Sequence, residues 1–154
     1  MHLISPSTVE PARAPWQNSG RAAKVLIVED NDIVSECLQT ILQAYGYDPI
    51  LAVTPDQAVE HCRREQNAIY ALIADVKLGQ FGGYATAQML TRICPDMKVV
   101  FTSGYPYEHL VRTGMLQAEL GAAKFLQKPF LASEIIAALQ LSFQARQETA
   151  QPGR

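Results

Sequence analysis

The stretch Val25-Leu26-Ile27-Val28-Glu29-Asp30 decides the fold, because four apolar residues run directly into two carboxylates. Ala71 to Ala74 is a second run of this kind, followed by Asp75, and the mostly apolar Lys124 to Gln127 is a third, followed by Lys128-Pro129. Short apolar runs without alternation are typical of strands buried on both faces of a parallel sheet. Because the carboxyl ends of parallel strands share one edge, we expect three carboxylates and one ammonium to meet there.

Composition restricts the class of protein. Of the 154 residues, 48% are hydrophobic and 18% charged, and the net charge is −2, which favours one globular domain. We find no basic cluster for direct nucleic-acid binding, no apolar stretch long enough for a membrane, and no secretory signal. Cys37, Cys62 and Cys94 lie far apart and form no metal or redox motif. We therefore expect a cytoplasmic protein whose cysteines are reduced packing groups.

Strands and helices are expected to alternate from residue 24 onward. The pattern predicts strands at 24–28, 47–53, 70–74, 97–102 and 123–126, and helices at 31–45, 55–66, 84–93 and 107–113. Thr54 is expected to cap the second helix and Ser133 the last one. The expected apolar faces are Ile33, Val34, Cys37, Leu38, Ile41, Leu42 and Tyr45 on the first helix, Ala85, Met89, Leu90 and Ile93 on the third, and Ile135, Ile136, Leu139 and Phe143 on the last.

This alternation predicts an α/β fold: a flavodoxin-like, doubly wound, five-stranded parallel sheet in the order 2-1-3-4-5, with helices on both faces. Residues 1–22 are rich in proline and serine and are expected to form a flexible tail or linker. We expect residues 23–146 to form the domain and 147–154 a short polar tail, which leaves no segment for a separate output domain.

The chemistry follows from the shared edge. In the order 2-1-3-4-5 the ends of the first and third strands are neighbours, which brings Asp30 beside Asp75. Two carboxylates about 5 Å apart repel, and a divalent cation, best Mg²⁺, would remove that repulsion. Asp75 is the candidate nucleophile for a phosphoryl group, Lys128 the cation opposite it, and Thr102 a hydroxyl donor between them. Each of these residues alone could be only a helix cap or a turn residue. Their shared position at one edge of the sheet is what favours a phosphoryl-transfer site.

Four segments together resemble the receiver domain of two-component response regulators. They are Val25 to Asp32, Asp75, Val99-Val-Phe-Thr-Ser-Gly104 and Phe125-Leu-Gln-Lys-Pro-Phe130, and the resemblance covers residues 24–146. It implies that Asp75 accepts a phosphoryl group from a histidine kinase or a histidine phosphotransfer protein and that partner binding then changes. Such a domain catalyses only its own Mg²⁺-dependent phosphorylation and dephosphorylation. The stretch from Gly104 to Phe130 is more similar to receivers of hybrid histidine kinases than to those of DNA-binding regulators.

The resemblance also implies roles for single residues. Four groups would hold Mg²⁺: Glu29, Asp30, Asp75 and the backbone carbonyl of Lys77. Thr102 and Lys128 would contact the phosphoryl group, and Phe125 would occupy an aromatic switch position that moves with Thr102. The Lys128–Pro129 bond would be cis, which proline permits at modest cost.

The sequence departs from the family pattern at three positions. Gly79 stands where the family usually has proline, and with Gly82 and Gly83 nearby we expect the Gly-rich loop over 75–83 to be looser than usual. Phe125 lacks the hydroxyl of the tyrosine often found there, so a switch would work by packing alone. Lys77 lies two residues after Asp75, and we expect its ammonium to lie near the phosphoryl group and to alter hydrolysis.

Other classes of function stay open at this point. The chain could be a receiver module of a longer hybrid kinase or multidomain regulator, a flavodoxin-like binding module that is not phosphorylated, or a metal-dependent phosphatase. A cofactor-binding module would need phosphate-cradling loops, whereas Glu29-Asp30-Asn31-Asp32 would repel a phosphate. A phosphatase of the aspartate type would need a second acid where Lys77 stands.

Overall fold

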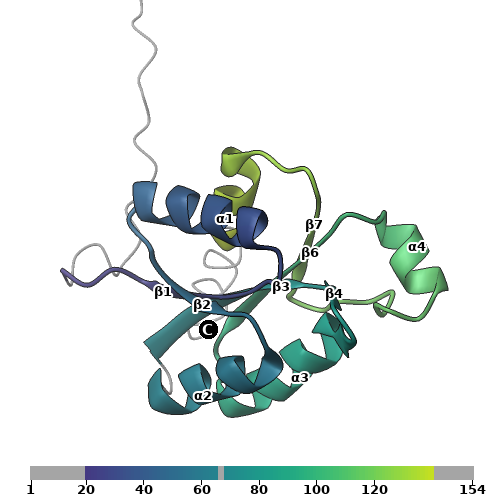
Figure 1. Ribbon diagram of the computed structural model, residues 1–154, viewed down its shortest axis with the longest axis horizontal. Helices are drawn as coiled ribbons and strands as arrows, with labels where there is room; N and C mark the ends of the chain where they lie inside the picture. Colours follow the sequence, from purple (N-terminus) through teal and green to yellow (C-terminus); the bar gives the residue numbers. More distant parts are fainter. Residues whose placement is uncertain (1–19, 66–67, 141–154) are drawn as a thin grey trace, which may run out of the picture.

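Five parallel strands form one central sheet in the computed structural model, which describes residues 20–65 and 68–140 (Figure 1). The strands are β1 (Lys24–Val28), β2 (Asp48–Ala52), β3 (Ile69–Asp75), β6 (Lys98–Ser103) and β7 (Lys124–Gln127). They lie in the order β2-β1-β3-β6-β7, and every neighbouring pair is parallel. With β6 and β7 as the fourth and fifth strands of the sheet, this is the predicted order 2-1-3-4-5.

Helices cover both faces of this sheet, as expected for a doubly wound fold. They are α1 (Asp32–Ala44), α2 (Pro55–Glu65), α3 (Gly83–Ile93), α4 (Tyr107–Arg112) and a last helix whose described part is 132–140. Figure 1 shows α1 and the last helix on one side of the sheet and α2 and α3 on the other, while α4 stands away from α3 at the right. The carboxyl ends of the strands are followed by the loops that lead into these helices.

Alternate residues of each strand point into two apolar layers. Leu26 and Val28 belong to the layer under α2 and α3, and Val25 and Ile27 belong to the layer under α1 and the last helix. All four side chains are 0% exposed. Burial on both faces explains why the strands are continuous apolar runs in the sequence.

The helix ends follow local rules. The side chain of Asn31 caps α1 by accepting hydrogen bonds from the N–H groups of Ile33, at 3.0 Å, and Val34, at 3.1 Å. Gly46, at φ 85°, ends the same helix in a left-handed conformation. Thr54 caps α2, since its Oγ1 accepts a hydrogen bond of 3.3 Å from the Gln57 N–H. The predicted role of Thr54 is confirmed.

The buried faces of α1 and α3 differ from the predicted ones. Ser35 is buried on α1, and because residues two apart point to nearly opposite sides of a helix, Ile33 is 79% exposed and Cys37 is exposed too. Tyr45 is the C-cap and is 50% exposed. On α3 the side facing the sheet consists of Gly83, Thr86, Ala87 and Leu90, which leaves Ala85 and Met89 exposed.

Two further expectations are wrong in detail. The segment 75–83 is not a loop throughout, because β4 (Lys77–Leu78) pairs antiparallel with β5 (Phe81–Gly82). The last helix begins at residue 132, so Ser133 lies inside it rather than at its cap; the Glu134 carboxylate instead accepts a hydrogen bond of 3.3 Å from the Leu131 N–H. Phe143, most of the expected tail 1–22 and all of the tail 147–154 fall outside the described residues.

The described helices and cysteines limit other functions. Within 20–65 and 68–140, no helix combines the length and apolar character that crossing a membrane requires. All three cysteines are free, and Cys62 and Cys94 are buried between the helices of one layer. Burial, with the neighbouring Cys94 as a lesser cause, raises the pKa of Cys62 to about 12. A thiol with so high a pKa is a poor nucleophile, which suits the expected packing role; the exposed Cys37 is not a packing group.

Candidate functional site

The carboxyl edge of the sheet carries the predicted site residues, and backbone hydrogen bonds hold them there. The Glu29 N–H donates to the Ala52 carbonyl at 3.3 Å, which extends the β1–β2 ladder beyond the last paired residues. The Lys128 N–H donates to the Ser103 carbonyl at 2.7 Å and does the same for β6–β7. Because these residues sit on strand ends rather than in free loops, their side chains emerge from a rigid part of the fold.

Three charged side chains meet at this edge. The Lys128 Nζ lies 3.0 Å from the Asp75 Oδ2 and 3.0 Å from the Glu29 Oε2. The Glu29 side chain is 2% exposed and the Asp75 side chain 11% exposed. The predicted proximity of Lys128 and Asp75 is therefore present, and the peptide bond between Lys128 and Pro129 is cis, as the resemblance implies.

Asp30 completes an acidic cluster. One carboxylate oxygen from each of Glu29, Asp30 and Asp75 lies within 4.8 Å of the others, and Asp30 is the exposed member. Oxygen ligands on one side with an exposed side for water suit Mg²⁺, which keeps several waters when it is bound to proteins. Receiver domains generally bind Mg²⁺ at an acidic pocket, and the donor set of this chain fits that ion.

Burial and neighbouring charges shift the proton equilibria of the site. Burial, followed by the charge of Asp75, raises the pKa of Glu29 above its usual 4.5, although Lys128 opposes the shift. For Lys128, burial is the largest influence and would lower the pKa, but the hydrogen bonds and charges of Asp75 and Glu29 outweigh it and hold the pKa above 10.5. Lys128 is therefore a permanent cation beside two closely spaced acids.

Thr102 is the most unusual polar residue of the site. It is 0% exposed, and its Oγ1 has no hydrogen-bond partner among the residues that the structure describes. Thr102 is paired in register with Asp75 across the β3–β6 ladder, and the Val76 N–H donates to its carbonyl at 2.9 Å. A buried hydroxyl without a partner costs about 1–3 kcal/mol, and a ligand that accepted its hydrogen bond would remove that cost.

The β4–β5 hairpin and the first residue of α3 pack tightly against the site. A Cβ added at Gly83 would lie 1.8 Å from the Asp75 carbonyl oxygen and 2.7 Å from its carbonyl carbon. The Gly83 N–H also donates to the Val76 carbonyl at 2.8 Å. Gly79 has φ 51°, and an added Cβ would lie 3.6 Å from the Asp30 Oδ2. Proline cannot adopt that φ, which explains why this hairpin has no proline at Gly79.

The role of Gly83 was not predicted from the sequence. We interpreted the Gly82-Gly83 pair as a source of looseness, whereas Gly83 permits a close approach of α3 to the strand end that carries Asp75. A glycine directly before a helix, eight residues after a candidate nucleophile, is the only signal the sequence offered. Which of the two glycines lies against the strand is decided by the tertiary structure.

Lys77 and Phe125 lie in contact with aromatic rings. The Lys77 Nζ stands 5.3 Å from the centroid of the Tyr105 ring, and its backbone N–H donates to the Asp75 Oδ1 at 3.1 Å. The half-buried Phe125 packs against Tyr107, with ring centroids 5.5 Å apart. The effect of Lys77 on hydrolysis, its carbonyl as a metal ligand and the switch role of Phe125 stay predictions.

Comparison with known proteins gives matches to one family. Residues 25–140 match the response regulator receiver domain. The sensor kinase CckA of Brucella abortus (strain 2308) is 31% identical over 109 residues, which cover 71% of this chain and 11% of that protein. The transcriptional regulatory protein ZraR of Escherichia coli (strain K12) is 29% identical over 107 residues, which cover 68% of this chain and 23% of that protein. The chain thus spans less than a quarter of either relative.

Solved structures share the fold. A response regulator receiver protein from Sinorhizobium medicae WSM419 superposes with a TM-score of 0.68 at 23% identity and covers 82% of this chain and 98% of its own. A response regulator from Thermotoga maritima superposes with a TM-score of 0.65 at 20% identity, and the match covers 80% of this chain and 99% of that chain. Fold, strand-end site and sequence match agree over the same residues, and the chain belongs to the family of response regulator receiver domains.

Proposed function

We propose that Asp75 accepts a phosphoryl group from a phosphohistidine of a histidine kinase or histidine phosphotransfer protein, in a reaction that requires Mg²⁺. The observation that carries the proposal is the position of the Lys128 Nζ, 3.0 Å from carboxylate oxygens of both Asp75 and Glu29. Three converging acids need a cation, and an acid with an ammonium beside it at a strand end suits phosphoryl transfer.

In the proposed reaction an Asp75 carboxylate oxygen attacks phosphorus, the bond from phosphorus to the histidine nitrogen of the donor breaks, and the donor imidazole leaves with the electron pair and takes a proton. The Lys77 N–H and the Lys128 ammonium each hold one oxygen of Asp75, so the attacking group is oriented before the donor arrives. Bound Mg²⁺ would supply charge neutralisation between the acids and the phosphoryl oxygens, held by Glu29, Asp30, Asp75 and the Lys77 carbonyl.

The product changes the charge balance of the strand ends. An acyl phosphate adds about −1.5 to −2 charges at Asp75. The buried Thr102 hydroxyl, which has no partner among the described residues, would donate to a phosphoryl oxygen, and Lys128 would turn from Glu29 toward the new charge. A movement of Thr102 on β6 would alter the packing beside it, including that of Phe125 on β7, and so change the affinity for a protein partner.

A protein donor is favoured by the surface around the site. Seven large apolar side chains of the described residues are exposed, and five of them come after the carboxyl ends of five different strands of the central sheet. The five are Ile33, Val53, Phe81, Tyr105 and Leu131, with exposed fractions of 79%, 43%, 49%, 42% and 66%. Exposed apolar side chains at the edge that carries a polar site suit contact with a protein partner. A partner that contacts these side chains could therefore reach Asp75.

We place this function in residues 23–146, in the cytoplasm. The relatives include a sensor kinase and a transcriptional regulator of which this chain covers 11% and 23%, so the same domain serves different outputs in those proteins. The activity proposed here needs only the strand-end residues, whether the domain works alone or as a module of a longer chain.

The test is labelling with a small phosphodonor. The wild-type chain is treated with acetyl phosphate and Mg²⁺, and intact mass and peptide mapping locate the added phosphoryl group. We expect labelling of wild type and of Asp56→Asn, a control carboxylate in the first turn of α2, and none of Asp75→Asn. Labelling of Asp75→Asn at the wild-type level would refute the assignment, and a folded wild type that is never labelled would favour the binding-module alternative. Asp30→Ala should weaken Mg²⁺ binding measured by calorimetry.

A further inference from the structure

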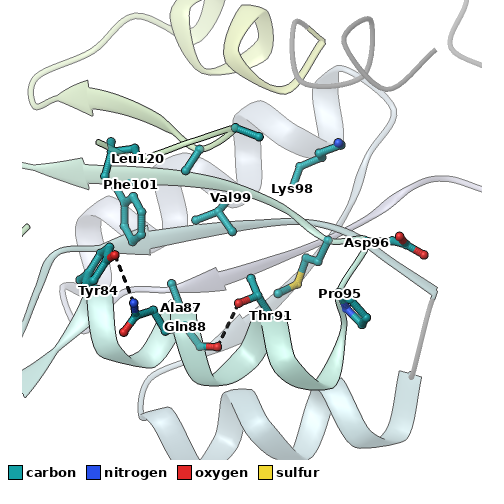
Figure 2. Close-up of a pocket in the computed structure, with 13 residues that line it drawn as sticks. Tyr84, Ala87, Gln88, Thr91, Pro95, Asp96, Lys98, Val99, Phe101 and Leu120 are labelled. Atoms are coloured by element: carbon teal, nitrogen blue, oxygen red, sulfur yellow. Dashed lines mark hydrogen bonds between the residues drawn. The ribbon is translucent and has the colours of Figure 1, made fainter. Parts of the chain in front are cut away.

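A groove extends from the amino-terminal edge of the sheet toward the acidic site, since its lining includes Tyr84 and Phe101, the sequence neighbours of Gly83 and Thr102. It has a volume of about 560 Å³ and runs between α3 and β6, with residues 120–123 along its other side (Figure 2). Figure 1 shows the reason: α4 stands away from α3, and α4 ends at Arg112, so no helix of the described chain covers β6 beside α3. Gly114, at φ 76°, directs the chain into the irregular segment that borders the groove.

The lining of the groove combines aromatic, aliphatic and polar groups. The rings of Tyr84 and Phe101 lie 5.7 Å apart at one end, and Figure 2 shows Val99 and Leu120 above α3. Gln88 and Thr91 present polar groups along α3, where the Gln88 amide donates to the Tyr84 hydroxyl at 3.1 Å. A surface with apolar walls and a polar rim suits an amphipathic aromatic side chain such as tryptophan better than a purely aliphatic one.

We propose that this groove receives the N-terminal segment of the same chain, residues 11–19, with Trp16 as the side chain that enters it. The segment leads through residues 20–23 into β1, and the groove extends to Pro95 and Asp96, which precede β6. Because β1 and β6 run in parallel in one sheet, the start of β1 and this end of the groove lie on the same edge. The chain therefore enters the domain at the edge to which the groove extends.

The distances permit this contact. In the order β2-β1-β3-β6-β7, β1 and β6 are two strand spacings apart, about 10 Å. The rise along β6 from Lys98 to Phe101 adds about 10 Å along the groove. The eight residues from Trp16 to Lys24 span up to about 27 Å when extended, so Trp16 reaches the middle of the groove without strain.

The composition of the segment favours it over the other end of the chain. Pro11 and Pro15 favour an extended chain before Trp16, which is the form that fits a narrow groove. Residues 141–154 contain two large apolar residues, Leu141 and Phe143, and both come within three residues of the last described helix, which lies on the other side of the sheet from the groove (Figure 1). A segment tethered so closely has an effective concentration in the millimolar range, so a contact that would be weak between separate molecules is still occupied.

The experiment uses Trp16 as its own reporter, because it is the single tryptophan of the chain. We compare emission and acrylamide quenching of the full chain for wild type, Thr91→Arg and Thr40→Arg. Thr91 lines the groove and Thr40 lies on α1 across the sheet, and in both the hydroxyl donates to a carbonyl of its own helix at 2.9 Å. In wild type and Thr40→Arg we expect blue-shifted emission and a quenching constant severalfold lower than in the urea-unfolded chain. In Thr91→Arg we expect the emission and quenching of a solvent-exposed tryptophan.

Two outcomes overturn the proposal. If Trp16 of the folded wild type is quenched as readily as that of the urea-unfolded chain, the groove is not occupied by this segment. If the protection of Trp16 disappears on dilution, the segment binds a second copy rather than its own domain. If Thr91→Arg fails to fold, the amide NMR spectra of the full wild-type chain and of Trp16→Ser are compared. Chemical-shift differences at the amides of Ala87, Thr91 and Val99 support the contact, and identical chemical shifts there refute it.

Discussion

Replacing Gly83 by serine tests how closely α3 approaches the strand end that carries Asp75. An added Cβ would lie 1.8 Å from the Asp75 carbonyl oxygen and 2.9 Å from the Val76 Cα, both backbone atoms that cannot rotate away. Relief requires α3 or the end of β3 to move by more than an ångström. That movement would stretch the 2.8 Å hydrogen bond from the Gly83 N–H to the Val76 carbonyl.

The magnitude follows from these two losses. Overpacking a tight contact costs about 1–3 kcal/mol, and a weakened backbone hydrogen bond adds about 0.5–1.5 kcal/mol. We expect the free energy of unfolding to fall by about 2–4 kcal/mol. With an m-value of about 2 kcal/mol/M, the urea midpoint measured by circular dichroism falls by roughly 1–2 M. Labelling of the folded fraction by acetyl phosphate should slow as well, because Asp75 moves.

Gly82→Ser is the matched control, since it places the same side chain one residue earlier. Gly82 has φ −83°, and the nearest atom to an added Cβ is the Ala85 Cβ at 4.0 Å. Serine also suits this position because Gly82 is the N-cap of α3. We expect a change within about 0.5 kcal/mol. Equal urea midpoints for Gly83→Ser and Gly82→Ser would refute the close approach.

Three further predictions concern the charged and buried polar groups. Thr102→Val should raise the free energy of unfolding of the unphosphorylated protein by about 1 kcal/mol in urea titrations, because it removes a buried hydroxyl that has no partner among the described residues; a loss of stability would contradict this. Lys128→Met should cost about 3 kcal/mol without Mg²⁺, because it leaves the Glu29 and Asp75 carboxylates facing each other, and added Mg²⁺ should restore more stability to the variant than to wild type. Since burial raises the pKa of Glu29 above 4.5 in the folded state, the folded protein takes up this proton first, and wild type should gain stability relative to Glu29→Gln as the pH falls through that raised pKa. At neutral pH Glu29→Gln should accordingly be the more stable of the two in urea titrations, and a difference independent of pH would refute the assignment.

The sheet and the position of the site could be predicted because both depend on local pattern. Strands buried on both faces need continuous apolar runs, and the runs that precede Glu29, Asp75 and Lys128 are visible without any tertiary information. Parallel pairing then places their ends on one edge. The register that sets Asp75 opposite Thr102 is a consequence of the same pairing.

The failed predictions concern positions where neighbours decide. Ile33 and Cys37 fit an apolar helical face by spacing, yet Ser35 faces the core because of the rotation of α1 on the sheet. The β4–β5 hairpin could not be predicted from glycine content, because two-residue strands have no pattern of their own. The start of the last helix depended on the reach of Glu134 to the Leu131 N–H, a contact that competes with the cap expected at Ser133.

By itself the sequence determined the parallel sheet and the acids and the lysine that follow its strands, because these depend on hydrophobic runs and on which residue ends each run; the strand order came from the flavodoxin-like arrangement of such folds. The tertiary structure alone decided that Lys128 bridges Glu29 and Asp75, that the Thr102 hydroxyl is buried without a partner among the described residues, and that Gly83 presses on the Asp75 backbone. These features depend on contacts between residues that are far apart in the sequence. They depend on how whole elements pack, which no local pattern records.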